Sequence, residues 1–573
     1  MTSRDNEKGI RVAVIGGGPV GVVTLKTLLR NSAVPIQAQL FEAQGAIGGS
    51  FFNAYENGAL VSSKQLTAFS DFRLPKHCPT YVTFAYYATY IEHYCSHFHL
   101  FPHINLRSRV LKVEILEEEA WRYRIHYSSV GEDESITQQI YECSHIAVCT
   151  GLQSKPYLLD IPGLKDFRGK AFHSADYKSP SQLTNEDVVI IGSGESAMDI
   201  AYAGILARAK SVTMCFRSGF LSIPRSLDLR IFGKPLGSPL SLDWLNANLF
   251  ETAYVHPFVA KSRLRWKFVD MIMKWVLYFL AENREELVQE VGRLPFRSWR
   301  NVYVNRNEAI VPYLNAPYKK VDAILDSEAC RQASNADERW INTCTIPSHI
   351  SPEGDVTFSS DLNRKDYRRV VNGPPIRAST VILCTGYKTL GSLLPKPYSD
   401  LSRATCRHML SPEDPTVVHM CFVRSWIGSS GPLAEMQAMW YTAYLDGRMS
   451  LPTSKAYYAL RSVNIHGHPG VDFPSYLATL ASDIGAKPNI FVLWWEYGYK
   501  VLLAYCFGGS FVSFYRLIGP FKEKDLMKEL VEGELWDTVK RKGLLGNFLF
   551  GLLPMIVFGL LNGVAWLCTS LVV

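Results

Sequence analysis

The chain has 573 residues, of which 47% are hydrophobic, so it is long enough for two or three domains with large cores and is not a disordered protein. The 60 Lys and Arg against 53 Asp and Glu give a formal charge of only +7, and no basic block indicates a nucleic-acid partner. The 12 cysteines contain no Cys-x-x-Cys pair, which argues against a dithiol redox centre or a zinc ribbon. One set has residue types that suit zinc, but it lacks a paired cluster, so we expect no metal site there: His93, Cys95, His97, His99 and His103.

The first glycine-rich segment follows a short apolar run near the N-terminus. Residues 10–15 (IRVAVI) predict the first buried strand of a parallel sheet, and residues 20–30 have helical spacing. The turn between them lets backbone N–H groups approach a pyrophosphate at a helix N-terminus. The next strand, over 37–42, ends in a carboxylate that can accept hydrogen bonds from ribose hydroxyls. We expect the cofactor to contact Gly16, Gly18, Pro19, Val20, Gly21 and Glu42.

A second unit of the same kind starts at residue 187. Residues 187–191 (DVVII) predict its first strand, and 211–216 (SVTMCF) predict the next one. Arg217 follows directly, and a cation there suits the 2′-phosphate of NADP better than a bare ribose. A solvated surface arginine is the alternative. The expected cofactor contacts of this unit are Gly192, Ser193, Gly194, Glu195, Ser196 and Arg217.

Two further runs have the same ending, and they indicate how the two units are connected. Residues 146–151 (IAVCTG) and 381–386 (VILCTG) each predict a strand that closes a nucleotide-binding sheet. The fold class is therefore α/β, with two Rossmann-like dinucleotide-binding domains and the second inserted in the first. We expect the first domain to comprise residues 1–165 and 336–450. The inserted domain comprises 166–335, with a membrane-facing or substrate-side insert at about 225–335. A C-terminal membrane-associated region follows at 451–543, and a transmembrane helix at 544–573.

The end of the chain is apolar enough to enter a membrane. Residues 544–573 contain no charged residue and are long enough to cross a bilayer as a helix. The basic run 540–542 precedes them, which indicates that this side faces the cytosol and predicts a single-pass tail anchor in contact with lipid. Asn547 and Asn562 leave a membrane-embedded hairpin as one alternative, and a buried core helix is another.

Two other segments have membrane-like composition. Residues 261–281 are basic at their start and apolar afterwards, which fits a helix lying on a membrane face or, equally, a buried helix. Residues 491–514 are rich in aromatic side chains but are interrupted by charges and glycines, so they predict an interfacial segment and not a spanning one.

The segment between the two glycine-rich turns narrows the function. Residues 167–177 read FRGKAFHSADY and contain the pattern Phe-x-Gly-x-x-x-His-x-x-x-Tyr. This pattern, just before a second dinucleotide fingerprint, resembles the identifying motif of the class B flavin-containing monooxygenases. Other segments resemble the family in order and spacing, and the last two of them resemble its microsomal, dimethylaniline N-oxide-forming branch: 41–42, 47–49, 62–64, 69–72, 384–387, 484–489 and 516–520.

The resemblance implies FAD in the first domain and NADPH in the inserted one. In that family NADPH reduces the flavin, the flavin binds O2 as a 4a-hydroperoxide, and a small-molecule amine or sulfide takes one oxygen atom. It also implies an endoplasmic reticulum membrane location with the catalytic domains facing the cytosol. His173 is expected at the cofactor, and the alternative is a structural role in which it fixes a turn. The further residues expected at the cofactors are Gly49, His173, Thr385, Gly386 and Gln437.

Three positions depart from the family pattern. Val61 stands where the family usually has an Asn that faces the flavin, and Val61, Ser62 and Ser63 are the expected flavin-face residues. Because valine cannot hydrogen-bond to the oxygenated flavin, our hypothesis is that this enzyme leaks more peroxide than relatives with Asn. Glu195 stands where Asn is common and is expected to cap its helix, and Phe51 stands where Trp is common.

Other functions remain as alternatives. Baeyer–Villiger oxygenation of a ketone is the nearest, but those enzymes often have Trp where this motif has Tyr177. An NADPH oxidase, or an inactive membrane-anchored nucleotide-binding scaffold, is the alternative outside oxygenation. A disulfide reductase also binds FAD and NADPH, but it needs the dithiol that this sequence lacks.

Overall fold

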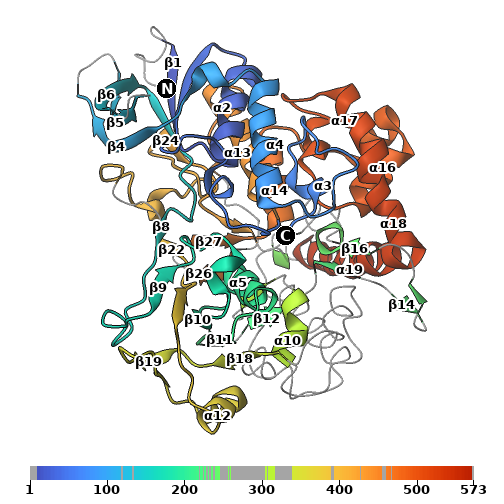
Figure 1. Ribbon diagram of the computed structural model, residues 1–573. Helices are drawn as coiled ribbons and strands as arrows, with labels where there is room; N and C mark the ends of the chain where they lie inside the picture. The colour runs from blue at the N-terminus through green and yellow to red at the C-terminus, as the bar shows by residue number, and fades with distance from the viewer. Residues whose placement is uncertain are drawn as a thin grey trace.

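The computed structural model has two parallel sheets, and each sheet carries one of the glycine-rich turns (Figure 1). This confirms the predicted α/β class with two Rossmann-type domains. Residues 261–281, expected to form a membrane-facing or a buried helix, lie outside the described part of the chain. The described residues are 9–117, 121–131, 135–217, 220–222, 225–227, 230–231, 234–235, 239–245, 256, 258–259, 303–305, 308–315, 339–388, 393–425, 428–453, 460–465 and 468–570.

The first sheet is built around the strand that precedes Gly16. Five of its strands run parallel, and β23 closes one edge in the antiparallel sense. Because β24 comes after the second sheet in the chain, the first sheet is complete only once the chain has returned from the inserted domain. The strand order is β23 (Leu410–Ser411), β24 (Asp414–His419), β7 (His145–Val148), β1 (Ile10–Ile15), β2 (Ile36–Phe41) and β3 (Ile104–Asn105).

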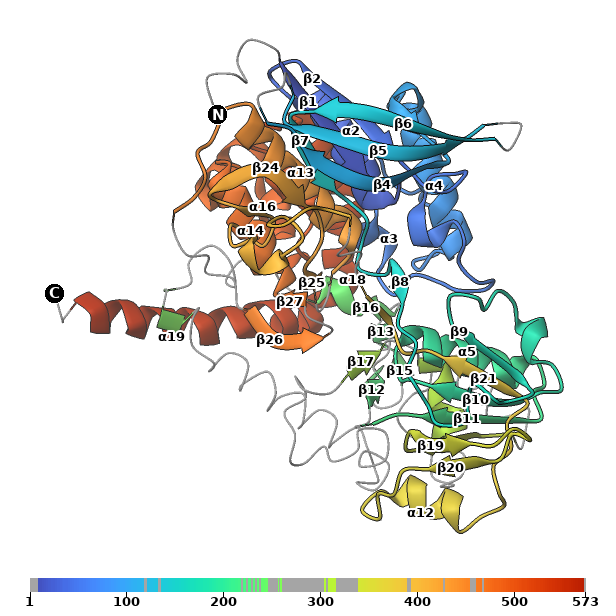
Figure 2. The same cartoon turned by 90° about the vertical axis from the view of Figure 1, so that its left-hand side faces the viewer.

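Both faces of this sheet are covered. Val12 and Val14 of β1 pack into the core formed with helices α2 (Pro19–Asn31) and α13 (Ser430–Leu445), whereas Ala13 and Ile15 pack toward an antiparallel layer. A strand buried on both faces explains the continuous apolar run in the sequence. Figure 2 shows the antiparallel layer beside β1 and β2, and it consists of β4 (Ser108–Ile115), β5 (Tyr123–Val130) and β6 (Ile136–Cys143).

The second sheet consists of five parallel strands and includes the strand before Gly192. Helix α5 (Glu195–Leu206) covers one face, where Val188 and Ile190 are buried, and a hairpin covers the other, where Val189 is buried. The strand order is β18 (Ile341–Cys344), β11 (Ser211–Cys215), β10 (Asp187–Ile191), β21 (Thr380–Leu383) and β9 (Lys170–His173), and the hairpin is β19 (Pro347–Ile350) with β20 (Val356–Phe358).

The chain passes between the two sheets along two short strands that pair with each other. β8 (Lys155–Pro156) leads into the second domain, and β22 (Tyr387–Lys388) leads back antiparallel to it. The inserted domain therefore contains β18 and β21, whereas the sequence predicts that the first domain resumes at residue 336. The boundary differs because the run 381–386 closes the inserted sheet beside β10, just as the run 146–151 closes the first sheet beside β1.

The C-terminal region is helical, and its last helix extends away from the rest of the molecule (Figure 2). The helical segment Lys524–Ser570 contains an 18-residue stretch that is apolar enough to cross a membrane, with a mean hydropathy of 2.2, and little of that stretch is buried. Gly543 adopts φ +63° within it, so the chain kinks just before the uncharged stretch. This long apolar helix is consistent with a membrane tail anchor. The helices are α14 (Phe473–Asp483), α16 (Tyr499–Phe507), α17 (Lys524–Leu530), α18 (Trp536–Asn547) and α19 (Leu553–Ser570).

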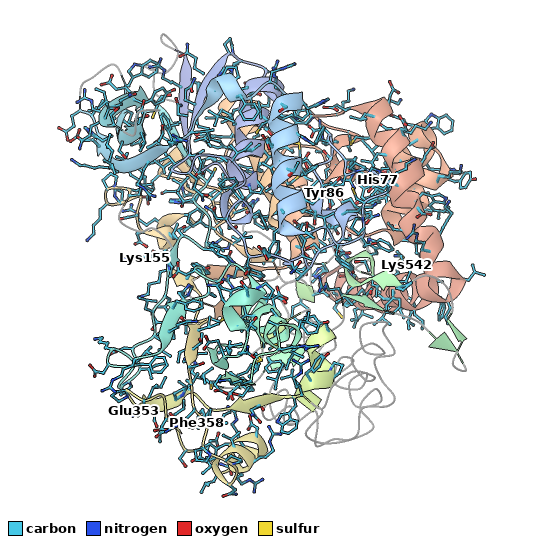
Figure 3. All side chains as sticks on the ribbon, in the orientation of Figure 1. His77, Tyr86, Lys155, Glu353, Phe358 and Lys542 are labelled. Carbon is cyan, nitrogen blue, oxygen red and sulfur yellow. The ribbon has the colours of Figure 1, made fainter. Side chains whose placement is uncertain are left out.

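Two polar residues at the tail contact other parts of the protein. Lys542, labelled in Figure 3, is buried and donates hydrogen bonds to the carbonyl oxygens of Trp244, at 3.0 Å, and Phe507. It therefore joins α18 to the body instead of adding a free charge to the basic run. Asn562 accepts a hydrogen bond from the backbone N–H of His256 at 2.8 Å, so this asparagine of the tail has a partner within the protein.

A buried cluster of charged side chains fixes the C-terminal region to the first domain. Arg516, which is 1% exposed, pairs with Asp71 at 2.9 Å and with Glu435 at 3.4 Å, and Lys26 also pairs with Asp71. Lys26 lies on α2, the helix that begins at the first glycine-rich turn, and Glu435 lies on α13. Four segments that are distant in the sequence meet in this cluster.

Candidate cofactor site

The first glycine-rich turn is so tight that side chains are excluded at two positions. Gly16 has φ +112°, and a Cβ there would lie 2.6 Å from the carbonyl oxygen of Cys149. A Cβ on Gly21 would lie 1.8 Å from the carbonyl oxygen of Gly16. Pro19 begins α2, and its N-cap residue Gly18 has no side chain to bond the free N–H groups of the first turn. The turn therefore presents backbone donors and a helix N-terminus, as binding of a diphosphate requires.

Glu42, at the end of β2, holds this turn in place. Its carboxylate accepts hydrogen bonds from the backbone N–H groups of Gly17, at 2.5 Å, and Gln44, at 2.7 Å, and the residue is buried. The sequence predicts ribose binding for this carboxylate, and no pattern indicated that it also supports the turn. The two roles are compatible because each carboxylate oxygen accepts more than one hydrogen bond.

The loop that follows β2 also packs against the turn. Gly48 donates its N–H to the carbonyl oxygen of Gly17 at 2.9 Å. Gly49 has φ +58°, and a Cβ there would lie 2.9 Å from the Cα of Gly18. Gly49, predicted to contact the cofactor, therefore touches the turn backbone to backbone.

The end of β7 supplies a buried polar group beside the turn. The Oγ1 atom of Thr150 is buried and has no hydrogen-bond partner in the part of the chain that the structure describes. The adjacent Gly151 has φ +72° and open space where a Cβ would lie. The site thus combines a buried hydroxyl without a partner among the described residues, a free helix N-terminus and a tight glycine turn. This combination fits the diphosphate and ribose of FAD.

The second glycine-rich turn repeats this geometry on the other sheet. Gly192 has φ +138°, and a Cβ there would lie 2.3 Å from the carbonyl oxygen of Cys384. Gly194 precedes α5 without a capping side chain, and Glu195 occupies the first helical position, where a carboxylate interacts favourably with the helix dipole.

Arg217 lies two residues after the end of β11, and its side chain is exposed. Carboxyl ends of parallel strands share one edge of a sheet, so Arg217 belongs to the same edge as the second turn. A cation at this edge fits the 2′-phosphate of NADPH. The residues that would hold NADPH are Gly192, Ser193, Gly194, Glu195, Ser196 and Arg217.

A tyrosine of the first domain reaches the second turn. The hydroxyl of Tyr55 donates a hydrogen bond to Asp199 Oδ2 at 2.6 Å and is also hydrogen-bonded to Ser196. Burial raises the pKa of Asp199, although the hydrogen bond from Tyr55 acts in the opposite direction. Nearby, Lys178 Nζ donates to the carbonyl oxygen of Asn53 at 2.6 Å. Neither Tyr55 nor Asp199 belongs to a sequence pattern used above, so this contact between the domains was not predicted.

His173 ties β9 to the loop after β21. Its Nε2 donates to the carbonyl oxygen of Gly386 at 3.0 Å, and its Nδ1 accepts from the N–H of Ala175 at 3.1 Å, which defines a neutral ring with its proton on Nε2. Burial lowers the pKa of His173. Thr385 Oγ1 donates to the carbonyl oxygen of Tyr157 in the linker. These contacts support the structural interpretation of His173, and cofactor contact by His173, Thr385 and Gly386 stays a prediction.

The expected flavin-face residues lie next to the insert. Ser63 caps the short helix α3 (Lys64–Thr67), and its hydroxyl also accepts a hydrogen bond from the indole N–H of Trp244 at 3.1 Å. Ser62 is buried and Val61 is half-buried. The hydroxyl of Ser63 is thus engaged within the protein, which leaves Val61 and Ser62 as the stronger proposals for the flavin face.

Gln437 supports a turn. It is fully buried on α13, where its Oε1 accepts from the N–H of Cys421 at 2.8 Å and its Nε2 donates to the hydroxyl of Tyr476 at 2.8 Å. Cys421 has φ +58°, an uncommon conformation for a residue other than glycine. The structure therefore gives Gln437 a role in the turn after β24, while the predicted contact with a cofactor is not tested.

The histidines of residues 93–103 do not converge on the cysteine among them. Cys95 is fully buried, whereas His93, His97 and His99 are exposed. Among the described residues, no group of three or more His, Cys, Asp or Glu side chains is arranged to hold a metal ion.

Two glycine cradles on separate parallel sheets, joined by a buried junction, define an oxidoreductase with two dinucleotide sites. The model of the flavin-binding monooxygenase-like family matches residues 9–236, which include both turns and the segment between them. The monooxygenase cfoE of Aspergillus candidus is 33% identical to this chain, with 98% of the chain and 99% of that protein covered. The chain therefore belongs to the flavin-binding monooxygenases, and it is a class B flavin monooxygenase that uses FAD and NADPH, as predicted.

More distant relatives and solved structures agree with this. The dimethylaniline monooxygenase (N-oxide-forming) 2 of Mus musculus is 24% identical, with 89% of each chain covered. The S-allyl-L-cysteine S-oxygenase from Allium sativum has a TM-score of 0.52 at 17% identity, with 93% of this chain and 98% of that chain covered. The cyclohexanone monooxygenase from Rhodococcus sp. Phi1 bound to NADP+ has a TM-score of 0.51 at 14% identity, over 77% and 85% of the two chains. At these identities the two structures show a shared fold.

Proposed function

We propose that this monooxygenase transfers one oxygen atom of O2 to the nitrogen or sulfur atom of a small molecule, as dimethylaniline-type enzymes do. The observation that carries the proposal is Tyr177, which completes the motif, is 1% exposed and packs with its ring centroid 5.6 Å from that of Tyr55. Ketone-oxygenating enzymes often have Trp at this position. The names of an N-oxide-forming relative and of an S-oxygenase with the same fold support the same choice.

The protein itself contributes binding, orientation and exclusion of water. Bound FAD, once reduced by NADPH, supplies the activated oxygen. The turn around Gly16, which Glu42 fixes, would hold the FAD diphosphate, and the turn around Gly192 would hold that of NADPH. The contact between Tyr55 and Asp199 keeps the two turns at a fixed distance and orientation, so that the nicotinamide can meet the flavin.

We further propose that the enzyme resides in the endoplasmic reticulum membrane, with both nucleotide domains in the cytosol and a single-pass tail. The apolar stretch within Lys524–Ser570 and the exposed basic residues 540 and 541 before it support this arrangement.

Cofactor content and reduction test the oxidoreductase part of the proposal. The purified protein should be yellow, and NADPH should bleach it in the absence of air. In Gly192→Ala the new Cβ would lie 2.3 Å from a carbonyl oxygen, so this variant should stay yellow but resist bleaching. A colourless wild-type protein that does not oxidise NADPH would favour the inactive scaffold.

Product analysis tests the type of oxygenation. The reduced enzyme is exposed to air with an organic sulfide and, separately, with a cyclic ketone. A sulfoxide without a lactone supports heteroatom oxygenation, and a lactone without a sulfoxide supports the Baeyer–Villiger alternative. NADPH consumption that yields only hydrogen peroxide with both substrates would indicate an oxidase.

A further inference from the structure

The segment before α16 exposes large aromatic side chains that a soluble surface rarely shows together. Trp495 is 90% exposed, Phe491 71%, Trp494 62% and Tyr499 61%. They belong to one short stretch made of α15 (Ile490–Val492), the π-helical turn Leu493–Tyr497 and the start of α16.

This stretch is firmly attached to the body of the protein. Leu493 and Val501 are 0% exposed, and Tyr497 is buried, with its hydroxyl donating to the carbonyl oxygen of Leu517. The inward side of the stretch is therefore well packed. The outward aromatic side chains are presented to the surroundings by an ordered backbone and are not the result of a loose segment.

The same stretch adjoins the start of the apolar tail. Helix α16 packs against α18 and against the turn Phe548–Leu552. A Cβ on Gly551 would lie 2.6 Å from the ring of Phe507, the last residue of α16, so this ring packs directly against the backbone of Gly551. Leu544, 94% exposed, begins the apolar surface of the tail. Helix α16 thus connects the exposed aromatic residues to the point where the tail begins.

The charges around the stretch suit a lipid headgroup layer. Lys500 is exposed, and the side chain of Lys524 is 53% exposed. The one acidic side chain among the aromatic residues, Glu496, pairs with Lys524 at 3.7 Å. Trp and Tyr concentrate where hydrocarbon meets water, and Lys side chains extend from there toward the headgroups.

We propose that Phe491, Trp494, Trp495 and Tyr499 form an aromatic patch that enters the headgroup layer of the membrane crossed by the tail. The tail alone would leave the enzyme free to rotate and tilt about one attachment. A second contact at the far end of α16 places this helix along the membrane surface and fixes the orientation of the catalytic domains. The proposal rests on the proposed membrane attachment and is independent of the oxygenation reaction.

Site-specific fluorescence in lipid nanodiscs tests the patch on the full-length chain. Cys330, which lies outside the described residues, and Cys568, which is exposed, are replaced by Ser, and Trp495→Cys then carries an environment-sensitive fluorophore. The discs contain phosphatidylcholine and phosphatidylserine brominated at shallow or deep acyl positions. Leu362→Cys, at a residue 70% exposed in the inserted domain, is the matched water-exposed control. A chain labelled at native Cys568, with only Cys330 replaced, reports on the tail.

Each outcome decides for or against the patch. We expect shallow bromines to quench the label at 495 roughly twofold or more over the label at 362, because aromatic belts lie at headgroup level. Equal quenching at 495 and 362, with strong quenching at Cys568, overturns the patch and leaves the anchor. No quenching at any of the three sites overturns both. Blue-shifted emission at 495 without quenching, seen only in discs with two chains, means that a second copy covers the patch and overturns the lipid contact.

Discussion

The hydroxyl of Tyr55 in the first domain donates a 2.6 Å hydrogen bond to the carboxylate of Asp199 on α5 of the inserted domain. The bond joins a loop after β2 to the helix that begins at the second glycine-rich turn. Both side chains are half-buried, and losing a hydrogen bond of this kind costs about 1 kcal/mol, so the bond favours one angle between the two domains. It is a direct link between the two glycine-turn domains.

Replacing Tyr55 by Phe should slow flavin reduction without removing flavin. The reaction needs the nicotinamide and flavin in near-attack geometry, so a small change of domain angle should lower the anaerobic bleaching rate about tenfold or more. Asp199→Asn keeps an acceptor oxygen and should lower the bleaching rate less, whereas Asp199→Ala should lower it as much as Tyr55→Phe. Stopped-flow absorbance measures all three variants. An unchanged rate in Tyr55→Phe would mean that other contacts, such as Lys178 with Asn53, set the angle.

Alanine at Gly21 should abolish FAD binding. Its Cβ would lie 1.8 Å from the carbonyl oxygen of Gly16, so the turn cannot keep its shape. Gly45→Ala is the matched control, because its Cβ would lie 3.5 Å from the nearest atom, on Arg107. The ratio of flavin to protein absorbance should fall to the baseline for Gly21→Ala and stay at the wild-type value for Gly45→Ala. Retained flavin in Gly21→Ala would contradict the assignment of this turn.

Asparagine at position 61 should improve the coupling of NADPH use to product formation. A side-chain amide can hydrogen-bond to the oxygenated flavin, which valine cannot do, so Val61→Asn should lower the ratio of hydrogen peroxide to oxygenated product. Val61→Leu, which adds no hydrogen-bonding group, should leave that ratio high. Peroxide and product are measured in the same reaction, and equal ratios for wild type and Val61→Asn would refute the idea.

His173 should make the domain junction sensitive to mild acid. Burial lowers its pKa in the folded protein below the unperturbed value of about 6.5. Its stabilising contribution is therefore complete above that value and is lost as the pH falls through the lowered folded pKa. His173→Gln keeps an N–H for Gly386 but does not titrate. Between pH values of about 7.5 and 5, the Tm of the wild type should fall more than that of His173→Gln, and equal losses would contradict this.

The buried Arg516 should be essential for stability. Arg516→Met leaves Asp71 and Glu435 without their arginine, and breaking a buried pair costs about 3–5 kcal/mol. Arg516→Lys keeps a positive charge and should lose less stability than Arg516→Met. Thermal unfolding followed by flavin release measures both variants. Equal destabilisation by Met and Lys would mean that the planar guanidinium, and not its charge, is what the cluster requires.

The cofactor turns were predictable because their chemistry is local. A buried strand, a glycine turn and a helix follow each other within a few residues around Gly16 and around Gly192, so their pattern is visible in a single stretch of sequence. The apolar tail is equally local. In each case the physical cause, a close backbone approach or a bilayer-length apolar run, depends on neighbouring residues.

What the sequence did not reveal depends on contacts between distant segments. Tyr55 meets Asp199, and Gln437 meets Cys421, only after the sheets have formed. The end of the inserted domain was predicted too early because an exit strand such as 381–386 can close either sheet, and only the pairing with β10 decides which one it closes. Side-chain roles at such junctions follow from tertiary packing and carry no local signal.

The pairing of β8 with β22 has a consequence for how this enzyme can be rearranged. The chain leaves the first domain and re-enters it at adjacent points on a two-stranded stalk. The entire inserted domain is therefore a cassette whose two ends meet, and exchanging it for that of a relative needs only two neighbouring joints. In such a chimera, preference for the reductant should travel with the cassette, while the flavin and the membrane attachment stay with the host.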